Sequence, residues 1–309
     1  MTLFSALIAL FIEQFLPLPA DRWVDQPLRR FSLWLAGKFD DGQYKHGVVA
    51  WCLGIGVPIL VVQGLYVFLW WAHPVLAALL GLFVLYLTMG FRQFSHFFTD
   101  LQLALQADEL DRARSLLAQW TGRNADRMNA SEMARVAIEQ ALVASHRHVF
   151  APLFCFALLG PGGALLYRLS AAFNRHWKAP AALPGQEASR FGDFARRAFD
   201  LIDWLPIRLT ATGFAVVGDF EDAIYCWRSQ ASHWPDITSG VLLSSGAGAM
   251  GISLGLPLHA DLDVEDRPEL GLGDPADVDH MQSTIGLVWR TLVLGLLVLA
   301  LFWVASWVG

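Results

Sequence analysis

The sequence predicts an all-α integral membrane protein, a polytopic helical bundle with a re-entrant broken helix and a cytoplasmic helical layer. Hydrophobic residues make up 55% of the 309 residues and charged residues only 16%, whereas soluble domains are about 45–50% apolar and about 25% charged. The mean hydropathy is +0.43. Several apolar runs also reach or approach the roughly 20 residues that a helix needs to cross a bilayer.

Composition also limits the possible partners. The net charge of -6 and the lack of a basic run exclude a nucleic-acid partner, because such binding requires Lys and Arg side chains that neutralise the phosphates. The 13 tryptophans indicate a lipid interface, so the lipid bilayer is the first expected partner. Cys52, Cys155 and Cys226 are odd in number and widely spaced, and they predict neither a disulfide framework nor a metal knuckle.

Four apolar stretches are predicted to cross the membrane. The first, residues 2–18, carries Glu13 and lacks a cleavage pattern, so we expect a retained helix. Residues 47–71 and 74–90 are joined by two residues and predict an antiparallel hairpin. Residues 285–308 form the last predicted crossing, with tryptophans at both ends as interfacial anchors.

Lysine and arginine residues orient these crossings. The loop at 18–46 holds five of them and the stretch 91–148 holds seven, whereas the turn after residue 71 holds none. Because loops rich in Lys and Arg remain in the cytoplasm, we expect a multi-pass protein of the bacterial inner (plasma) membrane with its main loops cytoplasmic.

The chain divides into five ranges by composition. These are transmembrane helices at 1–90, cytoplasmic helices at 91–148, a core with the re-entrant segment at 149–255, an acidic loop at 256–284 and a C-terminal transmembrane helix at 285–309. A short linker is predicted at 179–187.

The apolar stretch 149–173 is interrupted by Gly160-Pro161-Gly162-Gly163, which a continuous helix tolerates poorly. Basic residues flank the stretch on both sides, and two cytoplasmic ends favour a re-entrant broken helix. A kinked transmembrane helix is the alternative.

Two motifs resemble known sites but lack the surroundings that those sites need. His146-Arg147-His148 is a dense titratable cluster, yet zinc takes three or four ligands and no second His or Cys pair stands at ligand spacing. A polar entry to the apolar helix is the simpler interpretation. Residues 246–251 match GxGxxG, but no helix of sufficient length follows, which favours a packing or turn segment.

Arg208 lies in a moderately apolar segment, where a guanidinium needs an anionic partner such as Asp203 or Asp219. Together with Arg197, Arg208 is suited to hold a phosphate or carboxylate by bidentate hydrogen bonds. A structural ion pair explains the same residues equally well. The candidate ligand-binding residues are Arg123, Glu139, His146, His148, Arg197, Asp203 and Arg208. No catalytic residue and no metal ligand is predicted.

Six short patterns follow one another along the chain. They are Gly122-Arg123, Glu139 with Val149–Phe154, Gly160–Tyr167, Phe191-Gly192 with Arg197, Pro206–Ala211, and Gly251 with Gly255. In this order they resemble the CobD/CbiB superfamily of cobalamin-biosynthesis membrane proteins. Residues 23–28 and the single C-terminal anchor are similar to its AmpE-type branch.

The resemblance implies a reaction for the family's enzymes, the ATP- and magnesium-dependent amide ligation of adenosylcobyric acid to aminopropanol or its phosphate. Several polar positions of the enzyme pattern are replaced in this chain. They fall on Val143, Ala144, Arg147, His148, residues 171–176, residues 236–240, Leu243 and residues 26–28. A valine or leucine cannot replace a carboxylate as a metal ligand.

The resemblance therefore predicts a non-catalytic protein for sensing, binding or scaffolding in the AmpE manner, with no cofactor. Its ligand would be an anionic small molecule or a cell-wall-derived compound, and a membrane-protein partner is possible. The alternative is an adenosylcobinamide-phosphate synthase-like enzyme that uses ATP and magnesium. A transporter is disfavoured, because Glu13 is the one acid clearly inside a predicted crossing.

Overall fold

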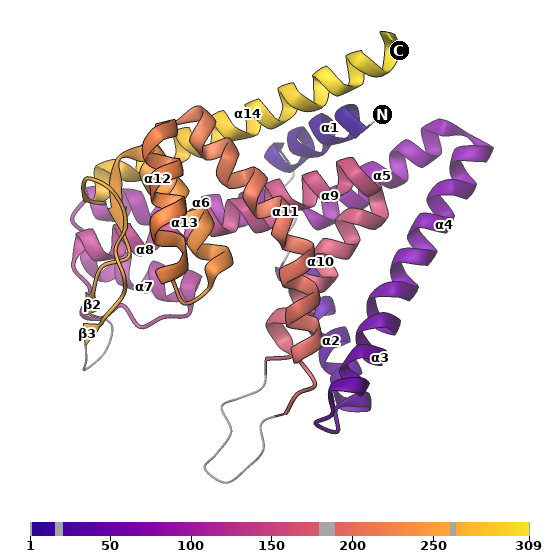
Figure 1. The fold of residues 1–309 in the computed structure, drawn as a ribbon, viewed down its shortest axis with the longest axis horizontal. Coiled ribbons are helices and arrows are strands. Elements are labelled where there is room, and N and C mark those ends of the chain that lie inside the picture. The colour runs from indigo at the N-terminus through magenta and orange to yellow at the C-terminus, as the bar shows by residue number, and fades with distance from the viewer. Residues whose placement is uncertain (1, 16–20, 179–188, 260–263, 309) are drawn as a thin grey trace. The chain divides into compact units, whose positions relative to one another are not determined.

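A computed structural model describes residues 2–15, 21–178, 189–259 and 264–308, and helices dominate these ranges (Figure 1). The predicted linker at 179–187 and the end of the first predicted crossing lie outside the described residues. The chain forms two compact units. Unit 1 comprises Met1–Gly90 and Ala151–Pro206, and unit 2 comprises Phe91–Phe150 and Ile207–Gly309. The range 149–255, grouped together from its sequence, contributes to both units.

Unit 1 is a helical assembly. Its elements are α1 (Thr2–Phe15), a π-helical turn at Asp21–Asp25, α2 (Gln26–Phe39), α3 (Tyr44–Trp51), a π-helical turn at Cys52–Gly56, α4 (Val57–Ala72), α5 (Pro74–Thr88), α9 (Ala151–Leu159), α10 (Pro161–His176) and the first part of α11 (Asp193–Val217). Buried aromatic side chains of α10 and its neighbours, among them Phe173, Trp177 and Phe191, form one of its cores. The π-helical turn at Asp21–Asp25, α2 and the start of α3 fall within the predicted loop at 18–46. Most of the described residues of that loop are therefore helical.

Within the described ranges, three helices are long and apolar enough to cross a bilayer: Tyr44–Ala72, Ala130–Leu159 and Val278–Ala305. The first and last contain most of the predicted crossings 47–71 and 285–308. Only 11% and 22% of their apolar windows are buried, against 56% for Ala130–Leu159. The apolar windows of Tyr44–Ala72 and Val278–Ala305 are therefore mostly exposed, whereas protein covers more than half of the window in Ala130–Leu159.

The predicted crossing at 74–90 is shorter than expected. Helix α5 has 15 residues, which at about 1.5 Å per residue fall short of the roughly 30 Å of hydrocarbon. Helix α1 is described for 14 residues, and the end of the crossing predicted at 2–18 lies outside the described residues. The helix at 130–159 was not predicted as one element. We expected a boundary at His148 because of the charged residues before it, but the backbone stays helical through them, with a π-helical turn at His146–Phe150.

The glycine-rich break separates α9 from α10. Gly160 has φ +67° and ψ −154°, a conformation that only glycine adopts readily. Gly163 allows close approach, because a Cβ there would collide with the carbonyl of Cys155. Ala151 and Tyr167 share one buried cluster, so the two helices form an antiparallel hairpin (Figure 1). The predicted interruption of the helix is confirmed.

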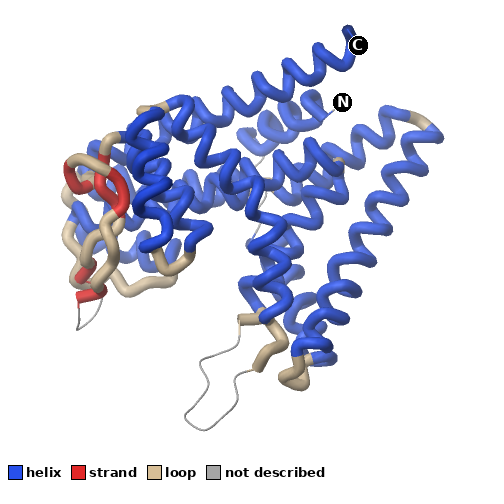
Figure 2. The backbone as a smooth tube through the Cα atoms, viewed as in Figure 1, coloured by secondary structure: helices blue, strands red, loops and turns tan. Residues whose placement is uncertain are grey.

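Unit 2 combines helices with short strands. Its elements are α6 (Phe91–Gln106), α7 (Leu110–Thr121), α8 (Ala130–Ser145), the π-helical turn at His146–Phe150, the second part of α11, α12 (Phe220–Gln230), a 3-10 turn at Ala231–His233, α13 (Ile237–Met250), β1 (Ile252–Leu254), β2 (Leu258–His259), β3 (Val264–Glu265), β4 (Leu270–Gly271), β5 (Asp274–Pro275) and α14 (Val278–Val308). β1 pairs antiparallel with β4 and parallel with β5, and β2 pairs antiparallel with β3 (Figure 2, red). These strands lie largely in the range expected to be an acidic loop.

The GxGxxG segment closes α13. A Cβ on Gly246 would lie 2.9 Å from Leu142 of α8, and one on Gly248 would lie 2.6 Å from the carbonyl oxygen of Asp222 on α12. Gly251, with φ +66°, then ends the helix before β1. The prediction of a packing or turn segment is confirmed, and the helices that pack against it, α8 and α12, belong to the same chain.

Asn129 starts α8 with a capping box. Its side chain accepts a hydrogen bond from the Glu132 N–H at 2.9 Å, and Glu132 accepts one from the Asn129 N–H at 2.9 Å. We expect Asn129→Ala to lower the free energy of unfolding by about 1 kcal/mol, the usual value of such a cap. Thermal unfolding in detergent, followed by circular dichroism, measures this. Asn129→Asp keeps an acceptor and should stay close to wild type, and equal melting of all three proteins would contradict the prediction.

Candidate functional site

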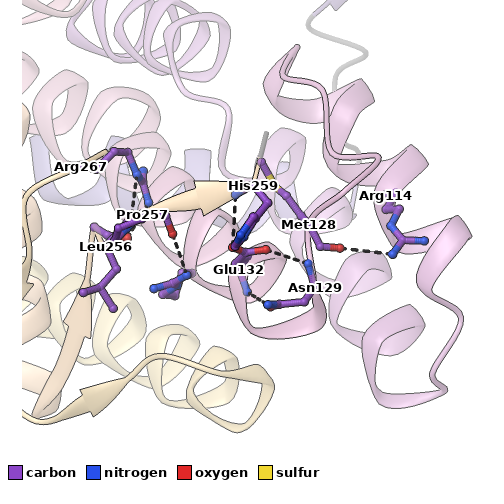
Figure 3. Close-up of polar contacts among 10 residues, drawn as sticks. Arg114, Met128, Asn129, Glu132, Leu256, Pro257, His259 and Arg267 are labelled. Atoms are coloured by element: carbon purple, nitrogen blue, oxygen red, sulfur yellow. Dashed lines mark hydrogen bonds and ion pairs between the residues drawn. The ribbon is translucent and has the colours of Figure 1, made fainter. Parts of the chain in front are cut away.

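Five charged or titratable residues gather on one face of α8 and are called the α8 cluster. Glu132, Arg135 and Glu139 stand on α8, and His259 and Arg267 come from the strand region. Spacings of three and four residues place the three α8 residues on one side of the helix, and each is less than 9% exposed. Figure 3 shows Glu132 facing His259, and Arg267 beside Leu256.

A bidentate ion pair forms the deepest part of the cluster. The Arg267 guanidinium donates to both carboxylate oxygens of Glu139, at 2.8 and 3.1 Å. Glu139 also accepts from the Gly255 N–H at 2.9 Å, and Arg267 donates to the carbonyls of Gly255 at 2.7 Å and Leu256 at 3.2 Å. Both charges are thus compensated, which burial requires.

The ion pair holds a strained turn. Gly255 and Leu256 have φ values of +72° and +61°, and a left-handed conformation is unfavourable for leucine. Arg267 and Glu139 bind the backbone of this turn on both sides. The cluster therefore fixes the path of residues 255–259 against α8.

A histidine–carboxylate pair lies at the edge of the cluster. Glu132 Oε1 is 2.7 Å from His259 Nδ1 and accepts from the His259 N–H at 3.3 Å, while its second oxygen accepts from the Asn129 N–H. The Glu132 side chain is 4% exposed and that of His259 is 60% exposed. A buried carboxylate thus orients an imidazole that remains open to solvent. Arg135 extends the same face and donates to the Pro257 carbonyl at 3.4 Å.

The donor atoms of the cluster do not fit a magnesium ion. Magnesium takes oxygen ligands in near-octahedral order, but the oxygens of Glu132 and Glu139 already accept hydrogen bonds from protein groups. Among the described residues, no group of three or more His, Cys, Asp or Glu side chains is placed to hold a metal ion.

The histidine motif faces the core of unit 2. His146 is 1% exposed, and its Nδ1 lies 2.9 Å from the hydroxyl of Thr210 on α11. His148 is half-buried on the same π-helical turn. The hydrogen bond joins the motif to the Pro206–Ala211 pattern.

The predicted arginines occupy separate places. Arg123 is exposed directly after α7, whose end Gly122 marks with φ +70°. Arg208 is half-buried on α11 within unit 2. Arg197 is exposed in unit 1, with its guanidinium 5.8 Å from the centre of the Tyr44 ring. A shared anion site of the three arginines stays a prediction.

Asp203 and Asp219, the acids predicted as partners of Arg208, each accept a hydrogen bond that the structure defines. Asp203, 1% exposed in unit 1, accepts a hydrogen bond from the Tyr167 hydroxyl at 3.0 Å. Asp219 caps α12 by accepting from the Asp222 N–H at 3.1 Å.

Sequence reasoning missed Glu132, Arg135, His259 and Arg267 as site residues. One signal pointed to Arg267: it is the single Lys or Arg in the acidic range 256–284. Nothing in the sequence indicated that the partner of Arg267 is Glu139, 128 residues away.

Comparisons with known proteins place the chain among relatives. A model of the CobD/CbiB protein family matches residues 6–288. A cobalamin biosynthesis protein CobD of Stutzerimonas stutzeri is 34% identical over 258 residues, covering 84% of this chain and 82% of the relative. A CobD of Chromobacterium violaceum is 31% identical over 217 residues, covering 70% and 68%. A CbiB of Salmonella typhimurium is 25% identical over 268 residues, covering 82% and 81%. No solved structure matches the chain.

Proposed function

This chain belongs to the CobD/CbiB family, and from that premise we propose that it serves cobalamin biosynthesis at the membrane, by acting on a corrinoid at an amide-forming step. The observation that carries the proposal is the 34% identity to the Stutzerimonas stutzeri CobD, sustained over 82% of that protein. Identity of this extent supports a common fold and a common class of substrate.

The contacts of unit 2 support the proposal. Glu139 and Gly255, which belong to two patterns of the family resemblance, are joined by a hydrogen bond although 116 residues separate them. Thr210, which belongs to the Pro206–Ala211 pattern, lies within hydrogen-bond distance of His146. The residues that resemble the family thus take part in the contacts that fold this unit.

The Glu132–His259 pair offers the proton acceptor that amide formation needs. An attacking ammonium group must lose a proton before its nitrogen bonds to a carbonyl carbon, and histidine is the usual acceptor. Glu132 holds the His259 ring through Nδ1, and the His259 side chain is 60% exposed. We propose His259 as this base and Glu132 as its positioning residue.

A second candidate function is corrinoid binding without turnover. It is favoured by the replacement of the family's acidic positions with residues such as Val143 and Leu243. The more specific AmpE-like sensing role, with a cell-wall-derived ligand and a membrane-protein partner, gains no support from relatives that are named for cobalamin biosynthesis.

We propose that the protein resides in the inner membrane, with its basic loops in the cytoplasm according to the positive-inside rule. The α9–α10 hairpin is then re-entrant. Its second arm, α10, has 16 residues, too few to cross about 30 Å alone, while its first arm, α9, is the end of the longer helix Ala130–Leu159. Cysteine accessibility in oriented vesicles tests this topology.

Turnover by purified protein tests the function. We expect protein in detergent, given adenosylcobyric acid, aminopropanol phosphate, ATP and magnesium, to form a new amide that mass spectrometry detects. His259→Gln should slow turnover about 100-fold or more, the usual contribution of a general base. The matched control is His233→Gln, which changes another exposed histidine of unit 2 and should retain turnover.

The outcomes separate the candidate functions. Corrinoid binding without ATP-dependent product would favour the second candidate. Neither binding nor product would overturn both. Equal turnover of His259→Gln and His233→Gln would remove His259 from the reaction while leaving the activity itself in place.

A further inference from the structure

Helix α2 has two faces of different character. One face packs on α10: Phe31 lies 6.1 Å from the Phe173 ring, and the Ser32 carbonyl accepts from the Trp177 indole at 2.9 Å. The opposite face is open to solvent and carries Leu33, 47% exposed, and Trp34, 53% exposed. Large apolar side chains on an open helical face indicate a partner that is partly apolar.

The same open face is strongly basic. Arg29, Arg30 and Lys38 are exposed, and the 14 residues of α2 include no acid. The Lys38 ammonium lies 4.4 Å from the centre of the Trp34 ring. Basic residues on both sides of Leu33 and Trp34 give α2 the pattern of an interfacial helix.

The acids next to α2 are already engaged. Asp25, before the helix, pairs with the buried Arg168 at 2.9 Å. After the helix, Asp40 accepts from the Gly42 N–H at 2.9 Å and Asp41 contacts His46. The hydrogen bond from His46 lowers the pKa of the Asp41 carboxyl. Among the described residues next to α2, these acids have partners of their own, and Arg29, Arg30 and Lys38 are exposed.

The position of α2 indicates what this partner is. The helix Tyr44–Ala72, apolar, mostly exposed and long enough to cross a bilayer, begins five residues after α2 ends, and five residues reach at most about 18 Å. Two further guanidinium groups, of Arg190 and Arg197, lie 6.0 and 5.8 Å from the Tyr44 ring where that helix starts. α2 thus lies close to the level at which the chain enters the bilayer.

We propose that the open face of α2 binds the anionic headgroups of the surrounding phospholipid. Arg29, Arg30 and Lys38 contact lipid phosphates, while Leu33 and Trp34 insert at the boundary between headgroups and acyl chains. Opposite charge selects anionic over zwitterionic lipid, and the two apolar side chains fix the depth of the helix.

Native mass spectrometry of the purified full chain tests this interaction. The protein in neutral detergent is mixed with phosphatidylglycerol or with phosphatidylcholine, and the retained lipids are counted. We expect wild type to prefer phosphatidylglycerol and R29Q/R30Q/K38Q to lose this preference, by about fivefold for each base removed. R29K/R30K keeps the charge and should behave as wild type.

A charge-matched control isolates α2 from net charge. R112Q/R127Q/R228Q removes three exposed bases of unit 2 and should keep the preference for phosphatidylglycerol. Equal loss in both triple variants, or none in R29Q/R30Q/K38Q, would overturn the proposal. The proposal would also be overturned if wild type were a dimer and R29Q/R30Q/K38Q a monomer, because the open face of α2 would then bind protein. Circular dichroism of each variant verifies that the fold is intact.

Discussion

Replacing Glu139 by alanine is expected to lower the free energy of unfolding of unit 2 by about 3–5 kcal/mol, the usual cost of leaving a buried charge without its partner. The Arg267 side chain is only 7% exposed, and Glu139 accepts two of its hydrogen bonds as well as one from the Gly255 N–H. Without that carboxylate, the guanidinium must draw in water or leave its site. Thermal unfolding in detergent and proteolysis near residue 255 measure the loss.

Two further variants serve as controls for Glu139→Ala. Glu139→Leu combined with Arg267→Met removes both charges and should recover most of the stability, because well-packed apolar side chains can replace a buried ion pair. Glu109→Ala breaks the exposed pair with Arg112, whose atoms lie 2.9 Å apart, and should change stability by less than about 1 kcal/mol. If Glu139→Ala were as mild as Glu109→Ala, the ion pair would not stabilise the fold.

Gly163→Ala is expected to disrupt the α9–α10 hairpin, at a cost of about 3 kcal/mol or more, the range of severe overpacking. The new methyl group would collide with the Cys155 carbonyl and lie 2.7 Å from the Leu159 Cβ. Because the first of these neighbours is backbone, one of the helices has to move away. The expected result is a lower melting temperature in detergent.

Gly64→Ala is the matched control for that experiment. Gly64 lies inside α4, and no atom stands within 4 Å of the place that its Cβ would take. Alanine is favoured over glycine in a helix by about 1 kcal/mol, so this variant should be neutral or slightly stabilised. Equal melting of Gly163→Ala and Gly64→Ala would show that the hairpin is not closely packed at Gly163.

The features that could be predicted from the sequence are those that neighbouring residues decide. The crossings at 47–71 and 285–308 follow from local hydropathy, and the break at Gly160 follows from glycine and proline chemistry. The Gly246–Gly251 segment was identified as packing because no helix of sufficient length follows it. In each case, the relevant information lies within a few turns of chain.

The features that escaped prediction depend on contacts between distant residues. Glu139 was selected as a candidate, but its partner Arg267 was not, because only the folded chain brings them together. The strands between residues 252 and 275 are two or three residues long and carry no periodicity. Helix α2 was predicted as part of a loop, because its Arg and Lys residues, which were used to orient the crossings, obscured its amphipathic pattern.

The interleaving of the two units has a consequence for how the protein is made. Helix α5 packs on α9 and α10, since Gly81 faces Phe156 and Pro161, yet the ribosome synthesises 60 residues of unit 2, from Phe91 to Phe150, before it reaches those helices. The nascent chain therefore carries α4 and α5 with part of their surface uncovered. That surface stays without its unit 1 neighbours until translation has passed Pro206.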